Sequence, residues 1–104
     1  MRVLVKSPRC PLHVEYVASN IEALQELVRG YVEVIPVNED VCIICDEEAR
    51  MKNKAYNLTF NDKNIFGRIA FVGIDGDEFV EVNYKLDKQI KEIVEVASGI
   101  PFKG

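Results

Sequence analysis

The sequence predicts an α+β fold: a mixed, mainly antiparallel sheet of five or six short strands, with two longer helices packed on one face. Three observations support this class. Short apolar segments rich in β-branched residues alternate with turn-forming residues. Two other segments place apolar side chains at helical spacing. The chain has 104 residues, the size of one domain with its own core, so we expect a single domain over residues 1–104.

The first third of the chain predicts two strands and a helix. Apolar and polar residues alternate over residues 2–6, and a second strand is expected over residues 12–17. Ser19 and Glu22 have the spacing of a capping box, in which each side chain satisfies an unpaired amide at the start of a helix. We expect the helix to begin there and to end at Gly30, which adopts the left-handed conformation easily.

The middle of the chain predicts a hairpin followed by a helix cap. Residues 31–37 and 41–45 are apolar segments, and the short polar side chains of residues 38–40 suit the turn between them. Asp46 comes next and is expected to cap a short helix. The two glutamates after it would lie in the first turn, where a negative charge is stabilised by the helix dipole.

The last part of the chain predicts a loop, a second hairpin and a second helix. Residues 53–64 show neither strand nor helix periodicity, so we expect an ordered loop. Residues 66–74 predict a strong strand, and the Asp-Gly pair at 75–76 indicates a hairpin turn into a strand at 79–82. Apolar residues at helical spacing predict a helix over residues 86–97.

Charge and composition exclude several classes of function. The chain has 17 acidic and 13 basic residues and a net charge of -4, with no basic block, so we expect no non-specific binding to nucleic acid. No apolar run approaches the roughly 18 residues of a membrane span. Lys6, Pro8 and Arg9 interrupt any signal-like segment, and three cysteines are too few for a disulfide framework. We therefore expect a cytoplasmic protein.

The cysteines and the single histidine suggest one alternative function, a small metal-dependent or thiol-based enzyme. Cys10 and His13 have a C-x-x-H spacing, and Cys42 and Cys45 have a C-x-x-C spacing, so together they offer four possible zinc ligands. However, residues three apart on a strand point to opposite faces, and Ile43 and Ile44 favour a strand. We therefore expect buried thiols, no bound metal and no cofactor.

Acidic residues form two further clusters, at residues 46–48 and 75–78. The first has the side chains to bind a divalent cation, but helix capping accounts for all three of its members. The second has some likeness to a calcium loop, yet it lacks oxygen ligands spread over twelve residues, and a hairpin turn explains it. Neither cluster predicts a metal site.

Several motifs resemble the domain of unknown function 3846 family, small proteins common in phages and bacterial mobile elements. They are the helix 21–28 followed by Gly30, the Asp-Glu-Glu at 46–48, the Tyr-Asn-Leu at 56–58 and the glycine-flanked strand 67–73. The resemblance covers roughly residues 2–82. Asp46 and Leu58 stand where the family tends to have asparagine and arginine. The resemblance implies an accessory protein of a mobile element and supplies no catalytic residues.

We therefore expect a non-enzymatic module that binds a macromolecule, with a protein as its partner. The expected loop at 53–64 supplies the candidate binding surface, which consists of Lys54, Tyr56 and Asn57 together with Arg68. Loops of this length in compact domains are more often functional than idle. A second candidate contact is self-association into a homodimer through Ile100 and Phe102.

Overall fold

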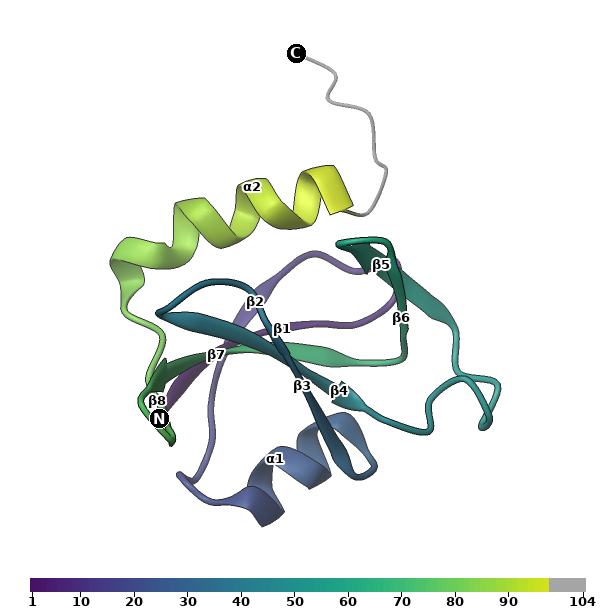
Figure 1. Ribbon diagram of the computed structural model, residues 1–104, viewed down its shortest axis with the longest axis horizontal. Coiled ribbons are helices and arrows are strands. Elements are labelled where there is room, and N and C mark those ends of the chain that lie inside the picture. The colour runs from purple at the N-terminus through teal and green to yellow at the C-terminus, as the bar shows by residue number, and fades with distance from the viewer. Residues whose placement is uncertain (98–104) are drawn as a thin grey trace.

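An antiparallel sheet separates two helices in the computed structural model, which describes residues 1–97 (Figure 1). The sheet has six strands in the order β2-β1-β7-β4-β3, with β8 paired to β7, and β5 and β6 form a separate two-stranded sheet. The strands of the large sheet are β1 (Arg2–Lys6), β2 (His13–Tyr16), β3 (Val32–Pro36), β4 (Val41–Asp46), β7 (Ile69–Asp75) and β8 (Glu78–Val80). The remaining elements are β5 (Tyr56–Phe60), β6 (Lys63–Phe66), the helices α1 (Ile21–Val28) and α2 (Asp87–Ala97), and a 3-10 turn at Tyr84–Leu86.

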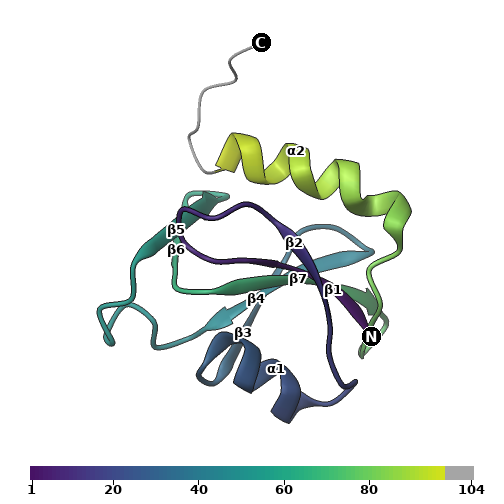
Figure 2. The same ribbon diagram turned by 180° about the vertical axis from the view of Figure 1, so that it is seen from behind.

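The two helices cover opposite faces of the sheet (Figures 1 and 2). The α+β class is confirmed, but the expectation that both helices pack on one face is wrong. The reason lies in β4, which is buried along its whole length. Cys42 and Ile44 pack in the core beneath α1, whereas Ile43 and Cys45 pack in the core beneath α2. A strand that is apolar on both faces requires a covering layer on each side.

Helix α1 begins and ends one residue away from the predicted caps. Asn20, not Ser19, is the N-cap, because its side-chain oxygen accepts a hydrogen bond from the amide of Ala23 at 2.8 Å. At the other end the left-handed conformation falls on Arg29, with φ at 58°, and not on Gly30. Glycine is needed at position 30 for a different reason: a side chain there would collide with the carboxylate of Asp46.

The segment between β4 and β7 differs most from the prediction. Residues after Asp46 form a series of turns and not a helix. The expected loop at 53–64 is instead the hairpin of β5 and β6, turned by Asn61 and Asp62, which both have positive φ. The expected strand at 66–74 is divided at Gly67, whose φ is 77°, into β6 and β7.

The two predicted hairpins are confirmed. β3 and β4 pair antiparallel from Val32 opposite Asp46 to Pro36 opposite Cys42. β7 and β8 pair across a turn that contains Gly76. Within residues 1–97, neither helix has the length and the apolar character needed to cross a bilayer. Ile100 and Phe102, the predicted homodimer contact, lie outside the described residues.

Candidate functional site

A groove of about 750 Å³ lies between α2 and the β5–β6 hairpin. Both elements contribute apolar side chains to it: Tyr56 and Phe60 from the hairpin, and Ile93, Val96 and Ala97 from the helix. Figure 1 shows that the hairpin lies beside the C-terminal half of α2, and the residues that line the groove come from these two segments. The volume is within the range of about 300–1,000 Å³ that is typical of ligand sites.

The apolar walls of the groove are left exposed by the way α2 packs. Ile90 and Val94 of α2 are buried against the sheet. Val96 lies off this buried stripe and is 76% exposed, and Tyr56 across the groove is 45% exposed. Large apolar side chains exposed beside a concave surface mark a binding site more often than isolated ones do.

The charge of the groove is negative. Asp62 of the β5–β6 turn and Glu92 of α2 line it, together with the polar residues Thr59, Asn61 and Gln89. No lysine or arginine is among the lining residues that the structure describes. The groove therefore combines apolar walls with carboxylates, an arrangement that favours an apolar ligand carrying positive charge.

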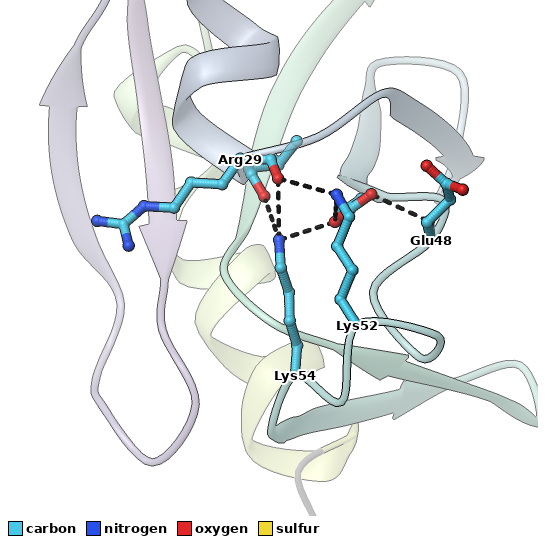
Figure 3. Close-up of polar contacts among 6 residues, drawn as sticks. Arg29, Glu48, Lys52 and Lys54 are labelled. Atoms are coloured by element: carbon cyan, nitrogen blue, oxygen red, sulfur yellow. Dashed lines mark hydrogen bonds and ion pairs between the residues drawn. The ribbon is translucent and has the colours of Figure 1, made fainter.

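Apart from the groove, the structure contains a polar centre around Asp46 at the end of β4 (Figure 3). Its side chain is completely buried and lies 2.8 Å from the ammonium groups of both Lys52 and Lys54. The backbone amide of Glu48 donates a further hydrogen bond at 3.0 Å. Burial of the Asp46 carboxyl opposes its ionisation, but the hydrogen bonds from the two lysines and from Glu48 outweigh this and lower the pKa to about 2.

Lys54 joins this centre to the end of α1. Its ammonium group also donates to the carbonyl oxygens of Val28 at 3.0 Å and Arg29 at 3.1 Å, which are left without partners by the end of the helix. With Asp46 as third acceptor, every donor of Lys54 is used. The guanidinium of Arg29 points away from the cluster in Figure 3. A Cβ on Gly30 would lie 2.3 Å from the Asp46 carboxylate, so only glycine fits at that position.

Asn57 lies at a β-bulge and is buried. The register of β5 and β6 shifts between Tyr56 and Leu58, so Asn57 has no partner across the hairpin. Its amide nitrogen donates to the carbonyl oxygens of Lys6 at 3.0 Å and Gly67 at 2.7 Å, and its oxygen accepts from the Lys6 ammonium at 2.9 Å. Asn57 is therefore paired inside the protein, and its contact with a partner stays a prediction.

Arg68 and Tyr56 complete the predicted binding surface. Arg68 forms an ion pair with Glu15 of β2 and is half-buried. Its Nε is the one buried side-chain nitrogen or oxygen in residues 1–97 without a hydrogen-bond partner. The ring of Tyr56 packs edge-on against Phe66 at 5.9 Å between centroids, and its hydroxyl contacts Thr59. Only Tyr56 among the four predicted residues lines the groove.

Comparison with protein families identifies the chain. The family model of a domain of unknown function, DUF3846, matches residues 1–95. The chain belongs to this family. Comparison with curated proteins and with solved structures gives no match.

In this DUF3846 protein, the residues behind the family resemblance lie at structural joints. Asp46 links β4 to the end of α1, Asn57 links β5 to β1, and Gly67 forms the corner between β6 and β7. Apart from Tyr56, the residues that line the groove lie outside these motifs, and the groove was not predicted from the sequence. Val96 could have indicated the groove, because it is an apolar residue of the last helix that lies outside the predicted buried stripe.

The thiols and the histidine of the DUF3846 chain do not converge. Cys42 packs under α1 and Cys45 under α2, on opposite sides of the sheet, as their spacing predicted. Burial raises the pKa of each thiol to about 11, which disfavours the thiolate needed for nucleophilic attack or metal binding. Cys10 is exposed in the turn before β2, and His13 pairs with Glu15 on the surface.

Proposed function

We propose that this protein is a non-enzymatic module that binds a protein partner through the groove between α2 and the β5–β6 hairpin. The setting we propose is the cytoplasm of a cell that carries a phage or another mobile element, as the family resemblance implies. The groove is the single observation that carries the proposal.

The shape of the groove supports a polypeptide ligand. Its helical wall extends from Gln89 to Ala97, which corresponds to about 12 Å of helix at 1.5 Å per residue. Val96 and Tyr56 are exposed on opposite walls. A peptide that carries two apolar side chains, spaced along a helix or strand, fills a groove of this kind and buries both walls at once.

The charge of the groove narrows the choice of partner. Asp62 and Glu92 lie beside the apolar walls, and the whole chain has a net charge of -4. Basic side chains in the ligand would therefore be attracted and acidic ones repelled, which affects the rate of encounter and the specificity of binding. We propose a partner segment with two apolar anchors next to a lysine or arginine.

The enzyme alternative receives less support. Its four residues, Cys10, His13, Cys42 and Cys45, are distributed over the turn before β2, the β2 strand and both faces of β4. None of them lines the groove. Nucleophilic catalysis needs a base within hydrogen-bond reach of the nucleophile, and the buried thiols pack among apolar side chains.

Selection from a random peptide display library on the full-length protein tests the proposal. We expect enriched peptides that contain two apolar residues and a lysine or arginine. Val96→Lys should weaken their binding at least tenfold, roughly 1.4 kcal/mol. Glu95→Lys is the matched control, because it introduces the same side chain at an exposed position of α2 outside the groove.

Two results would contradict the proposal. One is the absence of any enriched peptide. The other is a set of peptides whose affinity is equal in the Val96→Lys and Glu95→Lys variants, since these would bind elsewhere on the protein.

A further inference from the structure

We propose that Ile100, Pro101 and Phe102 occupy the groove of the same molecule and compete there with the partner. This inference rests on the proposed function, because it concerns regulation of the same site. Its occupant is a named segment of the chain that follows α2 directly in sequence.

The segment is within reach of the groove. Helix α2 ends at Ala97, and Ala97 itself lines the groove. Ile100 follows three residues later and Phe102 five residues later, so an extended chain carries them up to about 10 Å and 17 Å from Ala97. That distance is comparable to the length of the helical wall. Gly99 provides the backbone freedom that a reversal of direction onto the groove requires.

The segment has the chemistry proposed for the partner. Ile100 and Phe102 are two apolar anchors, and Lys103 follows them as a positive charge for Asp62 and Glu92. A proline between the two anchors leaves the undocked chain fewer conformations, so less conformational entropy is lost on docking. The segment after α2 therefore has the two apolar side chains and the positive charge that the walls and carboxylates of the groove favour.

Covalent linkage makes such docking effective even where the contacts are weak. A short connection produces an effective concentration in the millimolar range. An intrinsic affinity of that order is therefore sufficient to fill the groove in a large share of the molecules. A partner then binds only the open fraction, and its apparent affinity falls by that fraction.

Tryptophan fluorescence of the full-length chain tests the docking. The sequence contains no tryptophan, so Phe102→Trp introduces a single reporter. We expect blue-shifted emission and protection from acrylamide quenching, both independent of protein concentration. Adding Val96→Lys should shift the emission to that of exposed tryptophan, because it removes an apolar wall and repels Lys103. Adding Glu95→Lys should leave the emission blue-shifted.

Each other outcome overturns the inference. Exposed tryptophan in the parent shows that the segment does not dock, and burial that persists with Val96→Lys shows that it docks elsewhere. Burial that increases with protein concentration assigns the groove to the segment of a second copy.

Peptide affinity separates this inference from the proposed function. A full-length Ile100→Ser, Phe102→Ser variant should bind a selected peptide at least threefold more tightly than the parent. Equal affinity contradicts competition by the segment but leaves peptide binding intact. The opposite result is also possible: the Phe102→Trp reporter is buried, but the Ile100→Ser, Phe102→Ser variant enriches no peptide from the library. That result contradicts the proposed function and leaves the docking of the segment intact.

Discussion

At the scale of single residues, two buried polar side chains hold separate parts of the chain together. Asp46 accepts hydrogen bonds from Lys52 and Lys54, and Lys54 also contacts the end of α1. Asn57 joins β5 to β1 and to the corner before β7. Asp46 was predicted to cap a helix and Asn57 to lie in a loop, but both side chains connect segments inside the protein. Their roles depend on neighbours distant in sequence, which periodicity and local composition do not reveal.

The pKa of Asp46 predicts a pH dependence of stability. Its pKa of about 2 in the folded protein is below the ordinary value of 3.8, so the stabilisation is complete above pH 3.8. It is lost as the pH falls through the folded-state pKa, and the shift corresponds to about 2 kcal/mol. We expect Asp46→Asn to be less stable at pH 7 and to lose less stability than the parent between pH 4 and pH 2.

Urea denaturation at a series of pH values measures this difference. Asp40→Asn is a control because Asp40 is exposed. Parallel stability curves for the parent and Asp46→Asn would contradict the account of the Asp46 centre.

Asn57→Ala should destabilise the protein by about 2–4 kcal/mol, because it removes one hydrogen bond from the Lys6 ammonium and one from each of two backbone carbonyls. Burial already lowers the pKa of Lys6, so the loss of its amide partner is costly. Chemical denaturation measures the change, with exposed Asn64→Ala as the control. Unchanged stability together with weaker partner binding would return Asn57 to the binding surface.

At the scale of elements, the clearest patterns predicted the clearest structures. The β3–β4 and β7–β8 hairpins and helix α2 were all predicted from periodicity and turn residues. The β5–β6 hairpin was missed because the bulge at Asn57 interrupts the alternation of Tyr56 to Phe60. The groove was missed with it, since one of its walls is this hairpin.

The turn of the β5–β6 hairpin predicts a stabilising substitution. Asn61 and Asp62 have φ values of 48° and 64°, as a type I′ turn requires, and glycine is favoured at the second position. Asp62→Gly should stabilise the protein by about 0.5–1 kcal/mol, because relief of the left-handed strain exceeds the entropy cost of glycine, and Asp62→Ala should not. Thermal unfolding measures both, and equal effects would contradict the turn assignment. Asp62→Gly should also weaken binding of basic peptides, since Asp62 lines the groove.

At the scale of the whole molecule, the sheet divides the interior into two cores. Leu24 lies in the core under α1 and Ile90 in the core under α2, and both are fully buried. The arrangement of the helices could not be predicted from the sequence, because a continuous apolar strand such as β4 indicates burial but not which element covers each face. The protein is therefore layered as helix, sheet and helix, with the β5–β6 hairpin extending the α2 side (Figure 2).

Two separate cores predict additive effects. Leu24→Ala and Ile90→Ala should each destabilise the protein by about 2–5 kcal/mol. The double variant should lose the sum within about 0.5 kcal/mol, because the sheet lies between the two sites. Ile93→Ala should have a smaller effect, since Ile93 is only half-buried at the groove. Denaturant titration measures all four variants, and strong coupling between Leu24 and Ile90 would contradict the two-core arrangement.

The proposed function requires that the groove between α2 and the β5–β6 hairpin binds polypeptide. Backbone amide chemical shifts, recorded while a selected peptide is titrated into the ¹⁵N-labelled protein, test it most directly. We expect the largest shifts at residues 59–62 and 89–97, and we expect them to be lost with Val96→Lys but kept with Glu95→Lys. Largest shifts at the surface around Lys54 and Arg68, or along the outer edge of β2, would contradict it.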